Sequence, residues 1–429
     1  MKRLVTLVVP RIQAKRPLTF ALAIVTFLLA SPRTTGAAPD WPQWRGTHRD
    51  GRADGLTPPK KWPSKLRRLW KVEVGEGHAA PIVVGSRVYV HARRGEDEVA
   101  QAFELKSGAS LWAKGETIPY EMSSVALAHG KGPKSTPVFS DGRLYTQGIT
   151  GVISSFDAAS GERVWRKEFA EKYPRTSPNY GTAASPIIAD GLCIGLVGGH
   201  DAGAIKAFDA KTGALRWSWD GDGPSYASPV VVSTGGVREL IAFSQEALVS
   251  LDLSSGALRW KLPFKTSYAQ NSVTPLVQDG LLIYSGLNQG VHAVRLSARK
   301  ERPQKAWSTK KHPMYMSSPV IHENFLYGMT SKKKGSIFCL DAATGETRWQ
   351  SAGRQGENVA VVAAAGVLWL LSDKARLTIA ALDPKAYRVI AQYDDVAESL
   401  TWAHLTVIKR RVLIKDKTTL HCYAYLPKK

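Results

Sequence analysis

Cysteine is scarce in this sequence of 429 residues, which contains three and no adjacent pair. Both a disulfide-stapled scaffold and a cysteine-built zinc ribbon need more thiols, so these classes are excluded. Methionine is also rare, with five residues, which argues against a methionine-rich adaptable surface. Acidic residues are few as well: 36 Asp and Glu stand against 58 Lys and Arg, and the net charge is +22.

The common catalytic motifs are missing too. The sequence has no Gly-x-Ser-x-Gly, no phosphate-binding P-loop and no Gly-x-Gly-x-x-Gly after a strand. It also has no His-x-His or His-x-x-x-His pair that would place two imidazoles on one metal. After residue 38 no segment keeps a helical period over three turns, which argues against a helical fold.

The amino end has the pattern of an export signal. Residues 1–17 carry five basic residues and no acid, residues 18–30 are uncharged, and the small residues Gly36, Ala37 and Ala38 follow. The apolar run is shorter than the ~20 residues of a membrane helix, although an uncleaved anchor stays an alternative. We expect a signal peptide over 1–38 and a periplasmic or extracellular, envelope-associated protein without a lipoprotein cysteine.

The basic charge of the exported chain amounts to +16, because residues 1–38 carry six basic residues and no acid. An exported protein meets little nucleic acid, so we expect no nucleic-acid partner. The charged residues are spread along the chain, which favours a generally basic, solvated surface. An anionic glycan or an anionic membrane surface is the alternative partner.

A repeated phrase, apolar–Asp–x–x–Ser/Thr–Gly–x–x–x–Trp, is the main signal in the sequence. Its recurring positions are Asp157, Gly161 and Trp165; Asp209, Gly213 and Trp217; Asp252, Gly256 and Trp260; and Asp341, Gly345 and Trp349. A variant has Glu104, Gly108 and Trp112, and a copy with a longer turn ends at Trp307. We expect the Asp to accept hydrogen bonds from a tight turn, the Gly to supply a positive φ, and the Trp to pack on the neighbouring unit.

A second phrase, a small residue followed by Pro and two apolar residues, precedes each copy of the first. Its prolines are Pro81, Pro137, Pro186, Pro229, Pro275 and Pro319. With two degenerate copies near Val361 and Thr406, the sequence contains eight units. The second unit illustrates the pattern of four short strands: Thr136–Ser140, Arg143–Gln147, Val152–Asp157 and Glu162–Phe169, separated by Gly and Asp turns.

Four strands repeated eight times predict an all-β fold, an eight-bladed β-propeller of four-stranded blades. The last unit, Ala403 to Tyr425, ends after its third strand, whereas an unassigned strand containing Trp70 precedes the first unit. We expect this N-terminal strand to complete the last blade and close the ring. The predicted domains are then the signal peptide, an N-terminal Trp- and Arg-containing extension over 39–65, and the propeller over 66–429.

The phrase resembles the tryptophan-docking repeat of the pyrroloquinoline quinone (PQQ) propellers, which Ala207 to Trp217 matches closely. This superfamily includes PQQ-dependent dehydrogenases and non-catalytic propellers that act in outer-membrane β-barrel assembly. The segment from Asp40 to Gly51 is similar to the opening of exported PQQ-like propeller proteins. Its two tryptophans, Trp41 and Trp44, and the following Arg45 could plug one face of the ring.

The resemblance raises the question of a cofactor. A PQQ dehydrogenase needs an aromatic floor, Ca²⁺ held by carboxylate and amide oxygens, and an Asp base; its alcohol-oxidising members add a disulfide between adjacent cysteines. The weak candidates for cofactor binding here are Asn271, Glu357, Asn358 and Trp402. No catalytic residue of these enzymes maps onto a matching motif, so we expect no catalytic residue, metal or cofactor, with PQQ and Ca²⁺ as the alternative.

The loops that lead into the first strand of each unit share one face with the loops between its second and third strands. They contain a rim of polar and aromatic residues: His78, Tyr120, Tyr180, Tyr226, Tyr268, Asn271, Tyr315, Glu357, Asn358, Trp402 and His404. We expect a monomeric, non-catalytic module that binds envelope proteins through this face. The alternatives are a PQQ- and calcium-dependent dehydrogenase of alcohols or sugars, and a propeller that binds anionic glycans.

Overall fold

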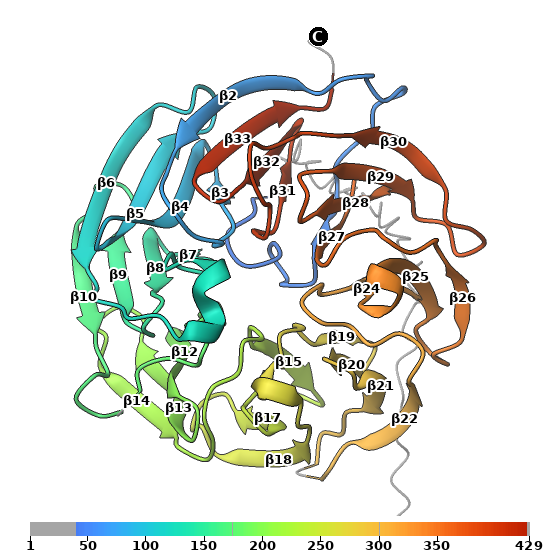
Figure 1. Cartoon of the computed structure of the whole chain (residues 1–429). Coiled ribbons are helices and arrows are strands. Elements are labelled where there is room, and N and C mark those ends of the chain that lie inside the picture. Colours follow the sequence, from blue (N-terminus) through green and yellow to red (C-terminus); the bar gives the residue numbers. More distant parts are fainter. Residues whose placement is uncertain (1–39, 174, 300, 427–429) are drawn as a thin grey trace, which may run out of the picture. The chain divides into compact units, whose positions relative to one another are not determined.

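The computed structural model describes residues 40–173, 175–299 and 301–426, so the predicted signal peptide lies outside the described residues. Within these residues eight antiparallel four-stranded blades surround a central channel, which confirms the predicted eight-bladed propeller (Figure 1), and one of them takes up a fifth, parallel strand from the N-terminal extension. We letter the strands of each blade A to D, from the innermost to the outermost. In the second blade the strand bounds differ from the predicted ones by up to two residues.

The first four blades follow one another along the chain without interruption. Blade 1 has β3 (Ile82–Val84), β4 (Arg87–Arg94), β5 (Asp97–Glu104) and β6 (Ser110–Thr117); blade 2 has β7 (Val138–Ser140), β8 (Arg143–Gln147), β9 (Ile153–Asp157) and β10 (Arg163–Lys167). Blade 3 has β11 (Ile187–Ala189), β12 (Leu192–Gly199), β13 (Ala202–Asp209) and β14 (Leu215–Trp219); blade 4 has β15 (Val230–Thr234), β16 (Val237–Phe243), β17 (Ala247–Asp252) and β18 (Leu258–Pro263).

Blades 5 to 8 complete the ring. Blade 5 has β19 (Leu276–Gln278), β20 (Leu281–Gly286), β21 (Gly290–Arg295) and β22 (Gln304–Thr309); blade 6 has β23 (Val320–His322), β24 (Phe325–Thr330), β25 (Ser336–Asp341) and β26 (Thr347–Gln350). Blade 7 has β27 (Val359–Ala364), β28 (Val367–Ser372), β29 (Leu377–Ala381) and β30 (Val389–Tyr393); blade 8 has β31 (Thr406–Ile408), β32 (Arg411–Lys415), β33 (Thr419–Ala424) and β2 (Arg67–Glu73).

In the described part of the chain the helical segments are three short 3₁₀ turns: η1 (Ser124–His129), η2 (Ser267–Ala269) and η3 (Lys332–Lys334). The first two lie in loops that lead into strand A, and η3 lies in the B–C loop of blade 6. Because neighbouring strands are antiparallel, both kinds of loop emerge at the same face of the ring (Figure 1). Among the residues that the structure describes, no helix has the length and hydropathy that a membrane crossing requires.

The ring is closed by a strand from the amino-terminal part of the chain, as predicted. Strand β2 pairs antiparallel with β33, and its Trp70 lies opposite Cys422. The last blade is therefore built from both ends of the propeller sequence. Without β2 the last blade would have three strands and would lack Trp70, whose indole N–H donates to the carbonyl of Leu105 in blade 1 at 3.0 Å.

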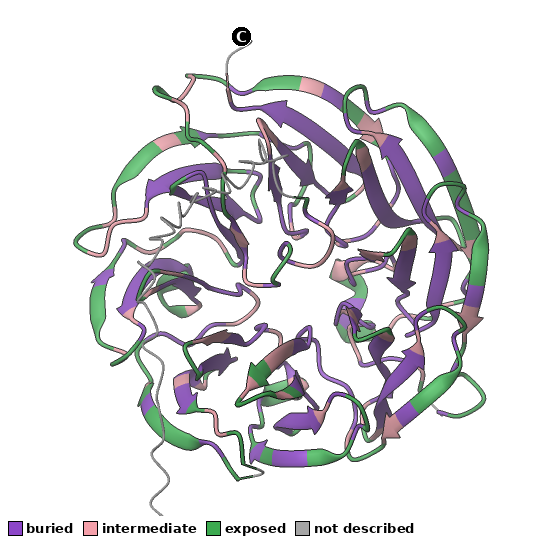
Figure 2. Cartoon of the chain, turned by 180° about the vertical axis from the view of Figure 1, so that it is seen from behind, coloured by how far each residue is buried: buried purple, intermediate pink, exposed green. Residues whose placement is uncertain are grey.

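The repeated tryptophans dock each blade onto the next. Six indole N–H groups donate to a backbone carbonyl of the following blade at 2.8 to 3.2 Å: those of Trp70, Trp112, Trp165, Trp217, Trp307 and Trp349. Trp260 is also buried, and its neighbour Arg259 donates to the carbonyl of Ala298 in the longer turn of blade 5. In the outer strands β10 and β14 the tryptophan is therefore a buried position among exposed and half-buried ones, and Figure 2 shows exposed residues along the rim.

The repeat glycine has two roles, of which the sequence suggested one. Gly213 and Gly256 have φ values of +72° and +71°, which favour glycine in the turn. A Cβ at either position would also lie less than 3.0 Å from the indole of the preceding blade's tryptophan. The repeat Asp orders the same turn, because Asp157 Oδ1 accepts the backbone N–H groups of Ala159 and Ser160 at 2.9 and 2.8 Å.

The second phrase builds an inner ring of hydrogen bonds between neighbouring blades. Hydroxyl groups just before or near the repeat prolines accept backbone N–H groups of the adjacent blade at 2.9 to 3.0 Å. In each pair the backbone N–H of the first residue donates to the side-chain hydroxyl of the second: Ala80 to Thr136, Thr136 to Ser185, Ser185 to Ser228, Thr274 to Ser318 and Val359 to Ser317. The start of each A strand is therefore fixed relative to its neighbours, and so are the loops just before it.

The N-terminal extension crosses the central channel and forms hydrogen bonds with six of the blades. Trp41 pairs with Val83 of blade 1, and Pro42 accepts the N–H of Phe139 of blade 2 at 2.8 Å. The buried Arg49 donates to the carbonyls of Ser185 and Pro186 at 3.0 and 2.9 Å, and its burial lowers its pKa to about 9. Further contacts reach the other side of the ring: Trp44 to Thr274, Arg45 to Pro319, and β1 (Arg52–Ala53), which pairs parallel with β27. Figure 1 shows this blue segment at the centre of the ring.

Candidate functional site

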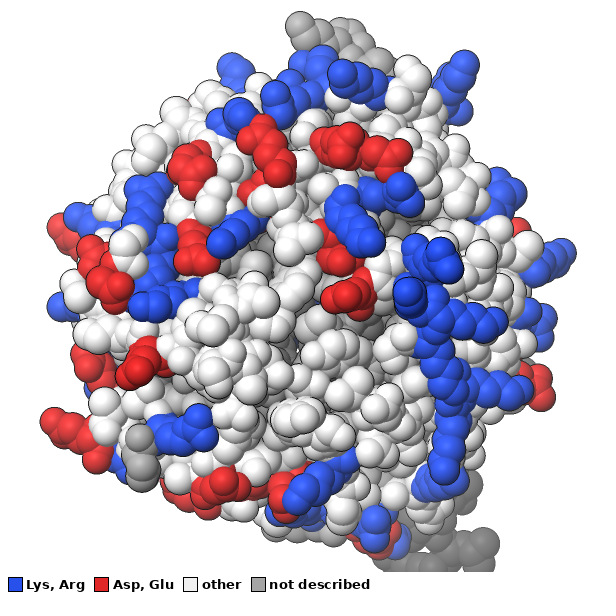
Figure 3. All heavy atoms as spheres, in the orientation of Figure 1, with Lys and Arg blue, Asp and Glu red and all other residues white. Residues whose placement is uncertain are grey.

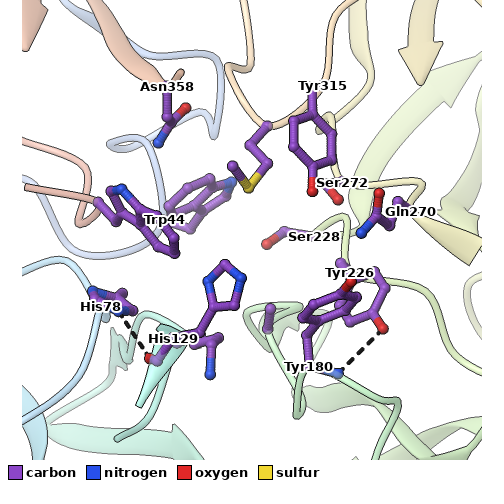
Figure 4. A pocket seen from close by; sticks show the side chains of 14 residues that line it. Trp44, His78, His129, Tyr180, Tyr226, Ser228, Gln270, Ser272, Tyr315 and Asn358 are labelled. Atoms are coloured by element: carbon purple, nitrogen blue, oxygen red, sulfur yellow. Dashed lines mark hydrogen bonds between the residues drawn. The ribbon is translucent and has the colours of Figure 1, made fainter. Parts of the chain in front are cut away.

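An axial pocket of about 150 Å³ lies at the face formed by the loops that lead into strand A. Each of the eight blades contributes at least one lining residue, and Trp44 of the extension completes the wall (Figure 4). The fourteen lining residues are Trp44, His78, His129, Lys134, Tyr180, Ala183, Tyr226, Ser228, Gln270, Ser272, Tyr315, Met316, Asn358 and Trp402. The repeat places them, because every lining residue except Trp44 belongs to a loop that leads into an A strand.

A continuous arc of aromatic rings follows one side of the pocket. Trp402 lies between His78 and His129, with ring centroids 5.3 and 4.4 Å away. His129 meets Tyr180 edge-on at 5.3 Å, and Tyr180 meets Tyr226 edge-on at 5.8 Å. Hydrogen bonds fix the rings further, from the N–H of Tyr180 to the hydroxyl of Tyr226 at 3.4 Å and between His78 Nε2 and the carbonyl of His129 at 3.1 Å. The arc offers a rigid apolar surface with polar edges.

The charge of the pocket is positive. Its cation is Lys134, whose ammonium group has one long hydrogen bond, at 3.4 Å to the carbonyl of Gly130. Burial lowers the pKa of Lys134 to about 8, while Glu76 and Glu98 act in the opposite direction. Burial and the charge of Lys134 lower the pKa of His78 to about 3, so His78 is neutral at pH 7. No Asp or Glu is found among the described residues that line the pocket.

Two buried ring nitrogens in the lining have no hydrogen-bond partner among the described residues: Nδ1 of His78 and Nε1 of Trp402. A buried polar atom without a partner costs free energy, on the order of 1–3 kcal/mol. A ligand that presents hydrogen-bonding atoms to this wall would recover part of that cost. The pocket is therefore suited to a group that combines an apolar or planar body with a donor for His78 Nδ1, whose ring proton is on Nε2, and an acceptor for Trp402 Nε1–H.

The structure separates the residues that the sequence suggested for a cofactor. Asn358 and Trp402 line the pocket, and the Oδ1 of Asn358 accepts the hydroxyl of Ser317 at 2.8 Å. Asn271 is fully buried, and its amide is used inside blade 4, where Nδ2 donates to the carbonyls of Ser244, Gln245 and Phe264. Glu357 is exposed and does not line the pocket. These four residues do not form one site.

Of the remaining rim residues, four line the pocket: His78, Tyr180, Tyr226 and Tyr315. Tyr268 is exposed on η2, whereas His404 is buried below Trp44, with ring centroids 5.3 Å apart. The residues that sequence reasoning missed are His129, Lys134 and Gln270. Lys134 and Gln270 lie three and five residues before a repeat proline, and His129 lies eight residues before one, so for Lys134 and Gln270 the position relative to that proline was a signal that could have identified them.

The pocket does not fit a calcium-bound quinone. Calcium takes six to eight oxygen ligands, with carboxylates prominent among them, whereas the described lining offers amides, hydroxyls and a lysine ammonium. Within residues 40–173, 175–299 and 301–426 no group of three or more His, Cys, Asp or Glu side chains could hold a metal ion. The three cysteines are buried and free, so no disulfide lies over the pocket.

Comparison with known proteins separates the fold from the function. Outer membrane protein assembly factor BamB of Yersinia pestis is 24% identical over 277 residues, which are 57% of this chain and 68% of that protein. A quinohemoprotein alcohol dehydrogenase of Pseudomonas putida is 29% identical over 153 residues, which are 32% of this chain and only 21% of the enzyme. The assembly-factor similarity therefore extends over most of the related protein, whereas the enzyme similarity is confined to a small part.

Solved structures share the architecture with both groups. BamB from Moraxella catarrhalis superposes with a TM-score of 0.62 at 14% identity, over 84% of this chain and 98% of that one. A europium-containing methanol dehydrogenase superposes with a TM-score of 0.65 at 13% identity, over 90% of this chain and 89% of the enzyme. At such identities the likeness shows the fold alone.

The family model described as outer membrane protein assembly factor BamB, a PQQ-like repeat model, matches residues 96–351, which is more than half of the chain. The match runs from blade 1 to blade 6 and includes the docking tryptophans from Trp112 to Trp349. This eight-bladed propeller belongs to the PQQ-like, BamB-like family.

Proposed function

We propose that this chain is a non-catalytic binding module of the cell envelope, which engages a protein partner through the face that carries the axial pocket. The observation that carries the proposal is the chemistry of the pocket: a lining drawn from eight blades that contains an aromatic wall along one side, one cation and no carboxylate among the described residues. Such a wall suits an anchoring side chain or loop of a partner, with the polar edges fixing its orientation.

The comparisons support a partner in the envelope. The relatives matched over two thirds of their length are outer membrane protein assembly factors by name, and the export signal predicted for residues 1–38 would bring this chain to the same compartment. A role in outer-membrane assembly itself is part of the proposal. The sequence identity of 24 to 25% leaves the partner to be identified by experiment.

The alternative is a PQQ- and calcium-dependent dehydrogenase, favoured by the aromatic wall and by the partial likeness to alcohol dehydrogenases. The side chains of the pocket do not support a dehydrogenase, because the described lining residues include neither a carboxylate for calcium nor an Asp or Glu base. The binding proposal requires no group that the pocket does not supply.

Site-specific photo-crosslinking in the producing bacterium tests the proposal. A photoreactive phenylalanine in place of Tyr315, which lines the pocket, is compared with the same residue in place of Val389, which is exposed on the outer strand β30. We expect Tyr315 to crosslink to one envelope protein, identified by mass spectrometry, and Val389 not to do so. The additional change Trp402→Ala, which removes part of the aromatic wall, should reduce that crosslink at least tenfold.

The proposal is wrong if the folded, exported Tyr315 variant yields no crosslinked protein, or if both positions yield the same proteins in the same amounts. A crosslink that is unaffected by Trp402→Ala would place the partner on the face but outside the pocket, which contradicts the anchoring role assigned to the aromatic wall. Circular dichroism of each purified variant establishes that the propeller is folded.

A further inference from the structure

A cluster of six cations lies beside the pocket, on blade 6. It combines three chain segments and consists of Lys310, Lys311, Lys332, Lys333, Lys334 and Arg354, all of them exposed. The sequence presented these residues as separate basic runs, and the fold brings them together. Figure 3 shows an uninterrupted blue band over this part of the face.

Backbone hydrogen bonds hold the three segments of the cluster in place. The N–H of Arg354 donates to the carbonyl of Lys333 at 3.0 Å, and the N–H of Gln355 donates to that of Gly335 at 3.1 Å. The ammonium group of Lys332 reaches the carbonyl of Lys310 at 3.0 Å. The backbone segments that carry the six charges are therefore held close together by the fold.

The cluster has no compensating acid. None of its six members forms an ion pair with a carboxylate of a described residue, whereas elsewhere exposed cations do so, as in Lys265–Glu246 and Arg376–Asp394. The positive field reaches a neighbouring imidazole: burial, together with Lys311 and Lys332, lowers the pKa of His312 to about 4. Like charges held within a Debye length, about 8 Å in physiological salt, repel one another unless an external anion neutralises them.

Exposed apolar side chains stand on the same face. On η1, Leu127 and Val125 are 68% and 54% exposed, and on η2, Tyr268 is 70% exposed. The loops that carry η1 and η2 emerge at the same end of the blades as the B–C loop that carries η3, and Figure 1 shows the three turns on the viewer's side of the ring. The face thus combines protruding lysines with protruding apolar groups.

We propose that this face docks on an anionic phospholipid surface, with the blade 6 cluster on the lipid phosphates and the apolar tips of η1 and η2 in the headgroup region. Clusters of four to eight Lys and Arg bind anionic bilayers through the sum of their charges. Aromatic and aliphatic side chains add affinity at the interface when they are paired with such basic groups.

Shape and composition favour a lipid surface over other polyanions. The charged side chains stand on exposed turns, which suits a flat array of phosphates better than a single chain that must be held in a groove. Five of the six cations are lysines, which act as mobile point charges, whereas bidentate recognition of carboxylates in a protein segment favours arginine. The inference goes beyond the proposed protein binding and does not depend on it, since vesicles contain no protein partner.

The test measures co-sedimentation of the exported protein with lipid vesicles. The amino terminus of the exported protein is determined by mass spectrometry. Vesicles of 30% phosphatidylglycerol in phosphatidylcholine are compared with pure phosphatidylcholine in 50 mM and 500 mM NaCl. We expect binding to the anionic vesicles alone, and release at high salt because the charges are screened. The variant Lys332→Gln, Lys333→Gln, Lys334→Gln should bind on the order of a hundredfold more weakly, since each lysine contributes about fivefold.

The matched control is Lys60→Gln, Lys61→Gln, Lys65→Gln, which removes the same charge from exposed lysines. These residues follow β1, which runs parallel to the inner strand β27 and leaves the ring at the opposite face. We expect this control to bind within about threefold of the unmodified protein.

Equal loss of binding in the two triple variants, or equal binding to both vesicle types, would overturn the proposal. Tighter binding to soluble polyglutamate than to the vesicles, lost in the η3 variant, would assign the cluster to an acidic protein segment and refute the lipid assignment. The crosslinking experiment at Tyr315 is read independently of these outcomes.

Discussion

The contact between the repeat glycine and the tryptophan of the preceding blade can be tested with a matched pair of glycines. Gly256 and Gly280 have nearly the same backbone, with φ of +71° and +72°. An added Cβ at Gly256 would lie 2.5 Å from Cε3 of Trp217, whereas at Gly280 nothing lies within 4 Å. The variants Gly256→Ala and Gly280→Ala therefore share the cost of the backbone and differ in the cost of the tryptophan contact.

The expected magnitudes follow from these two costs. Alanine in the left-handed region costs roughly 1–2 kcal/mol, and this is the whole effect expected for Gly280→Ala. Forcing a methyl group into a packed ring costs a further ~1–3 kcal/mol, because the indole must shift or its hydrogen bond to Leu253 must break. Gly256→Ala should therefore lower the free energy of unfolding by about 2–5 kcal/mol.

A double variant isolates the contact. Trp217→Ala alone should cost ~3–5 kcal/mol, as expected for a buried tryptophan. Once the ring is gone the methyl group at position 256 has room, so adding Gly256→Ala should cost no more than Gly280→Ala does. Urea unfolding followed by far-ultraviolet circular dichroism measures all four variants. Equal destabilisation by Gly256→Ala and Gly280→Ala would refute the role of Gly256 in tryptophan docking. So would a double variant whose cost equals the sum of the costs of Gly256→Ala and Trp217→Ala. The positive φ of the turn would then be the only requirement for glycine at this position.

Three further predictions follow from the buried groups. Burial raises the pKa of Glu98 to about 7, and the Ile149 N–H and Arg93 oppose this effect. Between pH 4.5 and 7 the Glu98 carboxyl group is therefore ionised in the unfolded chain and protonated in the folded chain. The free energy of unfolding falls as the pH rises through this range, by up to about 1.4 kcal/mol per pH unit. Glu98→Gln should remove that slope from pH-dependent urea unfolding, and an unchanged slope would contradict the assignment. The three buried cysteines should not react with a thiol reagent at pH 8 until the protein is unfolded, and a rapidly reacting thiol would contradict their burial. Trp70→Ala, at the closure of the ring, should cost ~3–5 kcal/mol in the same unfolding assay, and a cost below 1 kcal/mol would contradict closure through this strand.

The fold was predictable because its determinants recur. The repeat prolines and their two degenerate copies indicated eight blades, and the incomplete last unit together with the strand around Trp70 indicated how the ring closes. The second role of the glycine could not be inferred, because the residue that forbids a side chain at Gly256 is Trp217, in the preceding blade. Contacts between units leave no local pattern in the sequence.

The sequence predicted the location of the site better than the residues that line it. The loops before the A strands were expected to form one face, and Tyr180, Tyr226 and Tyr315 do meet at its centre. Lys134 was missed because a single lysine in a loop resembles every other solvated lysine until the fold buries it. The blade 6 cluster was missed for a related reason: Lys310 and Lys333 approach each other only because the B–C loop of blade 6 lies against the loop before its A strand.

The central claim is that the axial pocket binds a protein partner and that no calcium-bound quinone takes part. Calorimetric titration of the exported protein with PQQ in millimolar Ca²⁺, repeated with a chelator, tests it most directly, after a cooperative melt has shown that the protein is folded. The account predicts no binding heat that depends on calcium, because the described pocket offers the metal no carboxylate. Micromolar binding at one site that is lost with the chelator would contradict the account and identify the propeller as a quinoprotein.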